Sequence, residues 1–128
     1  MLDIENRTVS KAKALGEQFA TQRNLGTGGY SDFTGQRFDI VVNATSASLR
    51  GELPQVPATA FAAGCLAYDL VYGKGLTPFL RFARDAGAGQ LADGIGMLIE
   101  QAAEAFFWWR GVRPTTAALI ERLSVPLV

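Results

Sequence analysis

The sequence predicts an α/β fold in which helices pack on a parallel β-sheet. Short apolar segments at residues 2–4, 38–43 and 66–72 alternate with segments whose apolar residues recur at helical spacing. The segment at 38–43 is rich in β-branched residues, which is typical of a strand buried on both faces, as parallel sheets require. Strands that alternate with helices in this way indicate a layered α/β fold.

The bulk composition is that of one globular domain. The chain has 128 residues, of which 48% are hydrophobic and 19% charged. Twelve basic residues balance twelve acidic ones, so the formal net charge predicts neither a nucleic-acid nor a membrane partner. The polar start and the lack of a long apolar run predict no secretion signal, and a cytoplasmic location is the default.

Two residue types limit the chemistry. The sequence contains no histidine, which excludes serine–histidine catalysis and the usual zinc sites within this chain, and we expect no metal. The single cysteine, Cys65, lies in an apolar stretch, so we interpret it as a core residue in a reducing compartment.

The first half of the chain predicts a strand, a helix, a loop and a second strand. A short strand at 2–4 leads into a helix for which Thr8 is a suitable N-cap. The expected buried stripe of this helix is Ala12, Leu15, Gly16 and Phe19. Residues 24–29 read as a glycine-rich surface loop, which follows a helix and is therefore a poor match to a phosphate-binding turn. The strand at 38–43 ends in a small, polar loop at 44–51.

The second half begins with a buried strand at 66–72. Thr77 caps the helix that follows, Pro78 suits its first position and Gly87 suits its end. Its expected buried stripe is Phe79, Phe82, Ala83 and Ala86. A short strand at 91–92 precedes a helix at 94–110 that is apolar nearly all round, so we expect it to be buried on most sides. A final helix is expected at 115–123.

Basic residues crowd the start of the first helix. Arg7, Lys11 and Lys13 lie where the exposed amides already carry partial positive charge, and each misplaced cation costs about 0.3–1 kcal/mol. An anion at this helix start would explain them, because basic side chains and free amides together form a phosphate receptor. A solvated surface helix with unfavourable electrostatics is the alternative.

Small polar residues follow the strand at 38–43. Ligands of open parallel sheets bind beyond the carboxyl ends of the strands, and the segment Asn43-Ala44-Thr45-Ser46 occupies such a position. Taken alone, the segment also fits an ordinary strand-to-loop transition.

These segments, in this order, resemble the carboxyl-terminal, NADP-binding half of the shikimate dehydrogenase family. The resemblance covers nearly the whole chain. It rests on four motifs: Asn6-Arg7-Thr8 with Lys11, Asn43-Ala44-Thr45-Ser46, Tyr68-Asp69, and Ala92-Asp93-Gly94-Ile95-Gly96-Met97. It implies a Rossmann-like, doubly wound parallel sheet with NADP as the cofactor.

The resemblance assigns most of these residues to the cofactor. It implies that Asn6, Arg7, Thr8 and Lys11 surround the adenosine 2′-phosphate, and that Ala44, Thr45 and Ser46 contact the cofactor from the next loop. An arginine at the end of the second strand of a dinucleotide fold is typical of NADP binding, which agrees with Arg7. Glu5 argues the other way if its face of the strand meets the ribose, because an acid there favours NAD.

The remaining roles concern the nicotinamide and the substrate. By resemblance, Leu70 and Gly94 lie near the nicotinamide, and Met97 belongs to the same cofactor-binding set. Tyr72 and Gln101 would hold shikimate or 3-dehydroshikimate. From the residues alone, Tyr72 also fits an aromatic covering a sheet edge, and Gln101 also fits the wet side of its helix.

Some parts of the family pattern have no match in this chain. No glycine-rich turn precedes Asn6, and no residues match the family's substrate domain or its lysine–aspartate pair, so no catalytic residue is assigned. The expected fold is therefore an incomplete doubly wound sheet that lacks its first strand, with carboxyl-terminal helices. Because that strand lies at the middle of the usual sheet order, two unpaired edges are expected, and we predict poor stability, self-association or unconventional strand pairing.

The predicted function is that of part of an enzyme. Residues 1–128 would form the NADP-binding portion of an oxidoreductase that interconverts 3-dehydroshikimate and shikimate by hydride transfer, towards chorismate and the aromatic amino acids. The isolated chain is expected to be inactive. The alternatives are a quinate/shikimate dehydrogenase with relaxed cofactor choice, and a catalytically silent nucleotide-binding module that needs a partner chain.

Overall fold

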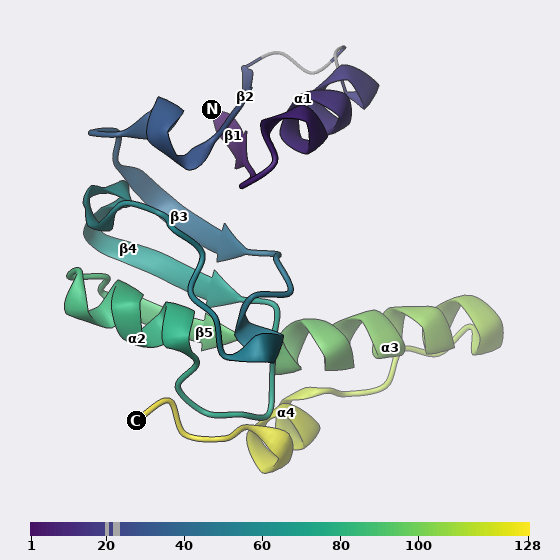
Figure 1. Cartoon of the computed structure of the whole chain (residues 1–128). Coiled ribbons are helices and arrows are strands. Elements are labelled where there is room, and N and C mark those ends of the chain that lie inside the picture. Colours follow the sequence, from purple (N-terminus) through teal and green to yellow (C-terminus); the bar gives the residue numbers. More distant parts are fainter. Residues whose placement is uncertain (20, 22–23) are drawn as a thin grey trace.

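The structure, a computed structural model, describes residues 1–19, 21 and 24–128 (Figure 1). Strands and helices alternate along the chain, as the sequence predicts. The strands are β1 (Leu2–Glu5), β2 (Leu25–Gly28), β3 (Phe38–Asn43), β4 (Phe61–Asp69) and β5 (Gln90–Asp93). The α-helices are α1 (Val9–Gln18), α2 (Pro78–Asp85), α3 (Ile95–Arg110) and α4 (Ala117–Leu123). Short 3-10 turns at Tyr30–Phe33, Ser48–Arg50 and Ala58–Ala60 lie in the connections.

All strand pairings are parallel, which confirms the predicted α/β class. β1 pairs with β2, and β3, β4 and β5 form a second sheet with β4 in the middle. Within the described part of the chain, no backbone ladder joins the two sheets, although β1 lies next to the β3 side of the larger sheet (Figure 1). The expected gap between the first and second strand pairs is therefore present.

The prediction of a surface loop at 24–29 is wrong, because this segment contains β2. Its glycines permit close packing instead of a turn. A Cβ on Gly26 would lie 2.0 Å from Oδ1 of Asp3 on the neighbouring strand. A Cβ on Gly16 of α1 would lie 2.4 Å from Cγ2 of Thr27, so the helix rests directly on β2.

The predicted stripe of α1 is only partly buried. Ala12 is 1% exposed, whereas Leu15 and Phe19 are 41% and 49% exposed. In the described part of the chain, α1 packs on the narrow β1–β2 sheet, and two strands cover less than the full apolar face of the helix.

β3 has the predicted bounds, but the prediction that it is buried on both faces is wrong. Val41 packs against the main core, while Ile40 and Val42 on the opposite face are 61% and 53% exposed. α2 covers one face of this sheet, and in the described residues no helix covers β3 on the other (Figure 1). β4 also differs from the prediction: it starts at Phe61, with a register shift against β3, and ends at Asp69.

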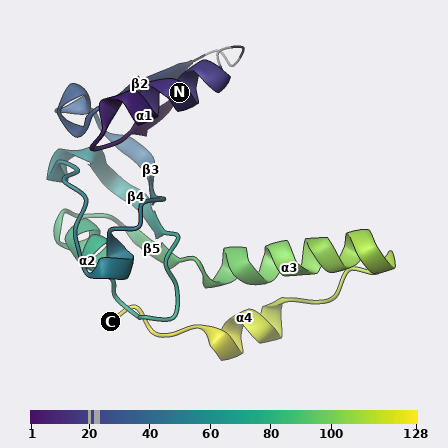
Figure 2. The ribbon, with the colours of Figure 1, turned by 45° about the vertical axis from the view of Figure 1, so that its right-hand side comes forward.

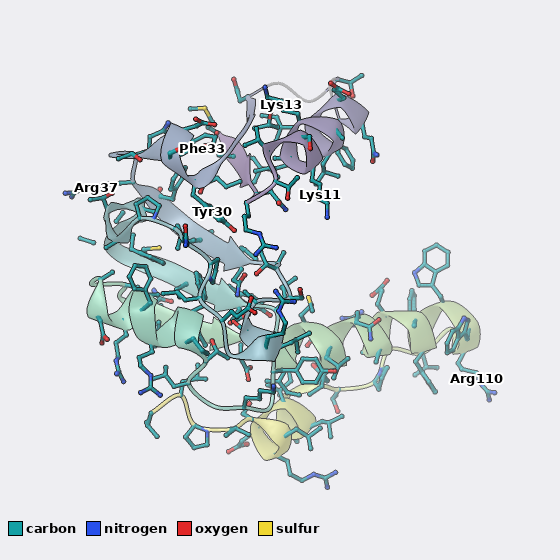
Figure 3. All side chains as sticks on the ribbon, viewed as in Figure 1. Lys11, Lys13, Tyr30, Phe33, Arg37 and Arg110 are labelled. Atoms are coloured by element: carbon teal, nitrogen blue, oxygen red, sulfur yellow. The ribbon has the colours of Figure 1, made fainter. Side chains whose placement is uncertain are left out.

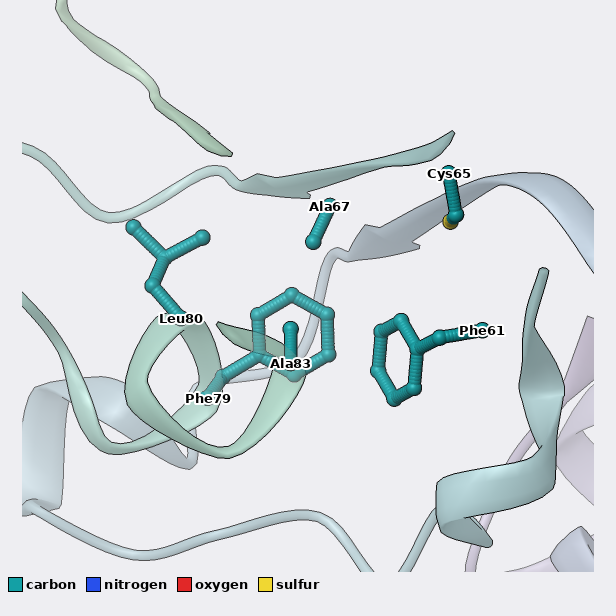
Figure 4. Close-up of a cluster of buried hydrophobic side chains, with 6 residues drawn as sticks. All are labelled: Phe61, Cys65, Ala67, Phe79, Leu80 and Ala83. Carbon is teal, nitrogen blue, oxygen red and sulfur yellow. The ribbon is translucent and has the colours of Figure 1, made fainter. Parts of the chain in front are cut away.

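The main core lies between α2 and the β3–β4–β5 sheet (Figure 4). It consists of Phe61, Cys65, Ala67, Phe79, Leu80 and Ala83. The rings of Phe61 and Phe79 lie 6.0 Å apart at 50°, a tilted arrangement that fills the space beside Cys65. The core position predicted for Cys65 is confirmed, since its residue is 1% exposed.

α2 begins and ends as its sequence predicts. Oγ1 of Thr77 accepts a hydrogen bond from the amide of Leu80 at 3.2 Å, and Pro78 takes the first turn. Gly87, just after the helix, adopts a φ of 96°. This left-handed conformation is the one that favours glycine at a helix end.

α3 is not buried on most sides, contrary to the prediction. Only Ile95, Ile99 and Ala103 are buried, and Trp108 and Trp109 are each 79% exposed. The helix projects away from the sheet with α4 alongside it (Figure 2). An apolar sequence shows that a surface can be covered, but in the described residues only α4 lies alongside α3, and the end of α3 stays exposed. In the described residues, no helix is long and apolar enough to span a membrane.

Salt bridges and a hydrogen bond connect α3 to the segment that follows it. Arg113 pairs with Glu100 at 2.7 Å and also with Glu104, and Oγ1 of Thr116 donates to Glu100 at 2.5 Å. These contacts turn the chain back along α3 and place α4 beside it.

Candidate functional site

The predicted site residues follow the carboxyl ends of the strands. In the larger sheet, Asn43 pairs with Asp69 and Asp69 pairs with Asp93, so the ends of β3, β4 and β5 lie side by side. The loops that leave these ends carry residues 44–46, 70–72 and 94. Parallel sheets bind ligands at this edge, and the topology brings the three loops together there.

The residues predicted to bind a phosphate lie at the end of β1 and the start of α1. Oδ1 of Asn6 accepts a hydrogen bond from the amide of Thr8 at 2.8 Å, and the amide of Asn6 donates to the Gly28 carbonyl at 3.1 Å. Thr8 occupies the N-cap position, but its own side chain makes no cap hydrogen bond, so Asn6 fixes this turn instead. Arg7 is exposed and has no acidic residue in the first helical turn beside it.

The basic cluster is smaller than the sequence indicates. Lys11 and Lys13 are two residues apart on a helix and therefore point to opposite sides of α1 (Figure 3). Lys11 lies on the side that faces the larger sheet, and Lys13 points away from it. Of the two lysines, only Lys11 therefore lies on the side of α1 that faces the larger sheet.

Glu5, at the end of β1, sits among other acidic groups. Burial raises the pKa of its carboxyl group above the ordinary value, and the charges of Asp3 and Asp32 raise it further. The folded state therefore favours the protonated form more than the unfolded chain does. The resulting stabilisation is complete at low pH and is lost as the pH rises through the raised pKa.

Replacing Glu5 with glutamine should remove this pH-dependent loss. Glu5→Gln is expected to raise the melting temperature at about pH 7 and to change it little at about pH 4, where the wild-type carboxyl is protonated. Asp39→Asn, at an exposed position on β3, is the matched control and should shift neither value. Equal increases for Glu5→Gln at both pH values would contradict the electrostatic origin.

The loop after β3 is built around the buried side chain of Asn43. Its Oδ1 accepts hydrogen bonds from the amide of Thr45 at 3.1 Å and from the Thr45 hydroxyl at 2.8 Å. The Thr45 oxygen in turn accepts from the amide of Ala47 at 3.2 Å. Thr45 therefore serves the shape of the loop, whereas Ala44 and Ser46 are exposed and open to a ligand.

Arg50 is a cation in this loop that the sequence analysis did not single out. Its Nη1 donates to Oγ of Ser46 at 2.8 Å, and it forms a salt bridge with Glu52 at 2.9 Å. The hydrogen bond from Arg50 holds the pKa of Glu52 below its usual value, and the charge of Arg7 acts in the same direction. The positive charge of Arg7 therefore acts on one residue of the loop after β3.

The structure brings Leu70 and Gly94 into direct contact. A Cβ on Gly94 would lie 2.1 Å from the Leu70 carbonyl oxygen, and the Gly94 amide donates to the Val71 carbonyl at 3.2 Å. Tyr72 follows in the same segment and is 44% exposed. These residues form a continuous wall beside the ends of β4 and β5.

Met97 and Gln101 lie one helical turn apart on α3, and both are exposed. Nε2 of Gln101 donates to the Leu98 carbonyl of its own helix at 3.1 Å. Gln101 thus lies on the solvent-exposed face of α3. For its amide nitrogen to contact a substrate, the hydrogen bond to the Leu98 carbonyl must break.

Known shikimate dehydrogenases match this chain in sequence. A sequence model of the shikimate 5′-dehydrogenase C-terminal domain matches residues 94–123. The shikimate dehydrogenase (NADP(+)) of Nitrosospira multiformis is 57% identical over 98% of this chain and 46% of its own length. The chain thus spans less than half the length of the curated relatives it matches.

Solved structures agree with the sequence relatives. The crystal structure of an Ael1 enzyme from Pseudomonas putida has a TM-score of 0.92 and 57% identity, and the match covers 99% of this chain and 46% of that one. Shikimate 5-dehydrogenase from Thermus thermophilus, in complex with NADP(H) and shikimate, has a TM-score of 0.74 and 32% identity over 93% of this chain and 43% of that one. Over nearly its whole length, the chain is therefore similar to the carboxyl-terminal portion of the shikimate dehydrogenase family.

Proposed function

We propose that this chain forms the NADP(H)-binding portion of an oxidoreductase that interconverts shikimate and 3-dehydroshikimate. The observation that carries the proposal is the placement of two cations at the start of α1: the charge of Arg7 acts on Glu52 in the loop after β3, and Lys11 lies on the side of α1 that faces the larger sheet. Support comes from the relatives, which are named as NADP(+) enzymes, and from the Thermus thermophilus complex with NADP(H) and shikimate.

The donor set fits an anionic dinucleotide. Exposed cations at Arg7 and Lys11 suit a phosphate, and the exposed Ala44 and Ser46 leave room for close approach beyond β3. Gly94 carries no side chain where a Cβ would meet the Leu70 backbone, so the segments that leave β4 and β5 pack closely together at this edge. When bound, NADPH would supply the hydride, and the residues of this chain would bind the cofactor and orient it.

Substrate contacts are assigned to the same edge of the sheet. Tyr72 and Gln101 present polar groups from the segment after β4 and from α3, and we propose that they hold the hydroxyl groups of shikimate. We assign no proton-transfer residue to this chain, because the family resemblance places the lysine–aspartate pair in a portion that this chain does not match. A cytoplasmic location and the absence of nucleic-acid and membrane partners stay predictions.

The phosphate receptor can be tested in a hybrid enzyme in which this chain replaces the matching portion of the Nitrosospira multiformis shikimate dehydrogenase. Arg7→Ala combined with Lys11→Ala is expected to raise the KM for NADPH by about 10- to 100-fold, because charge-assisted contacts to a phosphate are lost. The KM for NADH, which lacks that phosphate, should change little. Steady-state kinetics with both cofactors measure the difference.

Lys13→Ala provides the matched control for this experiment. It removes the same charge from the opposite side of α1, so it should leave the KM for NADPH unchanged. An unchanged KM for NADPH in the Arg7 and Lys11 double variant would overturn the assignment of the phosphate site.

A quinate/shikimate dehydrogenase that uses both cofactors is the second candidate. Glu5 favours it, because a carboxylate at the end of this strand is the group that binds the ribose hydroxyls of NAD. Comparable kcat/KM values for NADPH and NADH in the hybrid enzyme would support this candidate. A catalytically silent binding module would instead bind NADPH without any turnover in the hybrid enzyme.

A further inference from the structure

The carboxylate of Asp69, at the end of β4, is fully buried and accepts hydrogen bonds from four groups. Its Oδ2 accepts from the Ser48 hydroxyl at 2.6 Å and from the Thr77 hydroxyl at 2.7 Å. Its Oδ1 accepts from Nδ2 of Asn43 and from the amide of Val71, both at 3.2 Å. The residue is 0% exposed, and no buried side-chain polar atom in the described residues lacks a partner.

The donors come from separate segments of the chain. Asn43 and Ser48 bracket the loop that contains residues 44–46, and Nδ2 of Asn43 also donates to Ser48 at 3.0 Å. Val71 lies between Leu70 and Tyr72, and Thr77 closes the same connection at the start of α2. Asp69 thus joins the proposed cofactor loop to the proposed substrate segment through its side chain, beside the backbone hydrogen bond from the Leu70 amide to the Asn43 carbonyl at 3.1 Å.

A gain in folding stability does not by itself explain why a carboxylate is buried at this position. Burying a charge is costly, and apolar residues of similar volume often replace buried ionic groups without loss of stability. A fully satisfied polar network does, however, define a single arrangement of the segments that it connects. The carboxylate therefore fits a role in fixing geometry.

We propose that Asp69 is a positioning residue that holds the 44–46 loop and the Leu70–Tyr72 segment in one fixed arrangement. The proposal rests on the proposed function, because those two segments carry the cofactor and substrate contacts. A carboxyl group suits the site because it offers two acceptor oxygens, and all four neighbours donate to them. Asparagine keeps the shape but turns one acceptor into a donor that faces two donating partners.

Amide hydrogen exchange in the full 128-residue chain tests the arrangement without any ligand. Asp69→Asn is expected to speed exchange of the Val71 amide, the Ala47 amide or both by about tenfold or more, since the asparagine side chain has one acceptor oxygen and cannot serve both the Val71 side and the Ser48–Thr77 side. Amides of the β4–β5 ladder should keep their wild-type protection. Unchanged exchange at both Val71 and Ala47 would overturn the proposal.

The hybrid enzyme tests whether the arrangement matters for binding. Ser48→Ala loosens the loop side alone and should raise the KM for NADPH while the KM for 3-dehydroshikimate stays near wild type. Thr77→Val loosens the other side and should raise the KM for 3-dehydroshikimate, and Thr77→Ser, which keeps the hydroxyl, should restore it. Asp69→Asn should raise both KM values.

A merely structural role would give a different result. In that case the variants would lower kcat in proportion to the folded fraction and leave both KM values unchanged, which would overturn the proposal. Failure of the proposed function would be seen separately, as a wild-type hybrid enzyme without NADPH-dependent turnover. The exchange experiment would then decide the positioning role by itself.

Discussion

Replacing Gly94 with alanine is expected to destabilise the chain by about 3 kcal/mol or more and to abolish activity of the hybrid enzyme. The added Cβ would lie 2.1 Å from the Leu70 carbonyl oxygen and 2.8 Å from the Leu70 carbonyl carbon. Both are backbone atoms of the segment after β4, so no side-chain rotation relieves the contact. The Gly94 amide also donates to the Val71 carbonyl at 3.2 Å, which holds the two segments together.

Gly96→Ala is the matched control, because it makes the same change two residues later. No atom lies within 4 Å of a Cβ built on Gly96, and the residue is in the first turn of α3. Alanine there should stabilise the chain by about 0.4–1 kcal/mol through the lower entropy of the unfolded state. Urea unfolding of both variants measures the contrast, and equal midpoints would contradict the proposed close contact.

The contrast between these glycines also shows what a sequence can predict. α2 was predictable because its signals are local: a capping threonine, a proline in the first turn and a glycine past the end act within a few residues. β2 was not predictable from glycine content. Gly26 and Gly28 serve close packing on Asp3 and on the turn at Tyr30–Phe33, and that need arises only from parallel pairing with β1.

Burial was harder to predict than secondary structure. The apolar sequences of β3 and α3 indicate surfaces that can be covered, but coverage depends on which segments reach them. Ile40 and Val42 on β3 and Trp108 and Trp109 on α3 remain exposed because α2 and α4 cover other surfaces. The spacing of apolar residues and the composition of a segment do not indicate which helix will cover it.

The sequence predicted where the candidate site lies, but not the hydrogen bonds that hold its loops in place. The motifs fall at the strand ends because parallel topology places every strand's carboxyl end at one edge. The hydrogen bonds of Asp69 reach Asn43 and Ser48, which are 26 and 21 residues away along the chain. A pairing over that distance depends on the register between β3 and β4, which sequence spacing does not reveal.

The gap between the two sheets leaves the facing edges of β1 and β3 open, and for this reason we expect the chain alone to self-associate and to show no NADPH formation from shikimate. β1 pairs only with β2, and β3 pairs only with β4, in the described residues. Exposed backbone edges beside apolar side chains promote association. A parallel strand placed between β1 and β3 would satisfy both edges, and we expect the amino-terminal portion of the Nitrosospira multiformis enzyme to supply it when added in trans.

Sedimentation and turnover measurements on the mixture test this expectation. The chain alone should form concentration-dependent oligomers without activity, and adding the amino-terminal portion should give a one-to-one complex that reduces NADP with shikimate. Ile40→Thr combined with Val42→Thr keeps β-branched residues on β3 but removes its exposed apolar groups, so self-association should weaken. Leu123→Thr, at a half-exposed position on α4 away from this edge, should leave self-association unchanged. A monomeric chain that melts cooperatively, or that oxidises shikimate by itself, would show that the open edges are satisfied within these 128 residues.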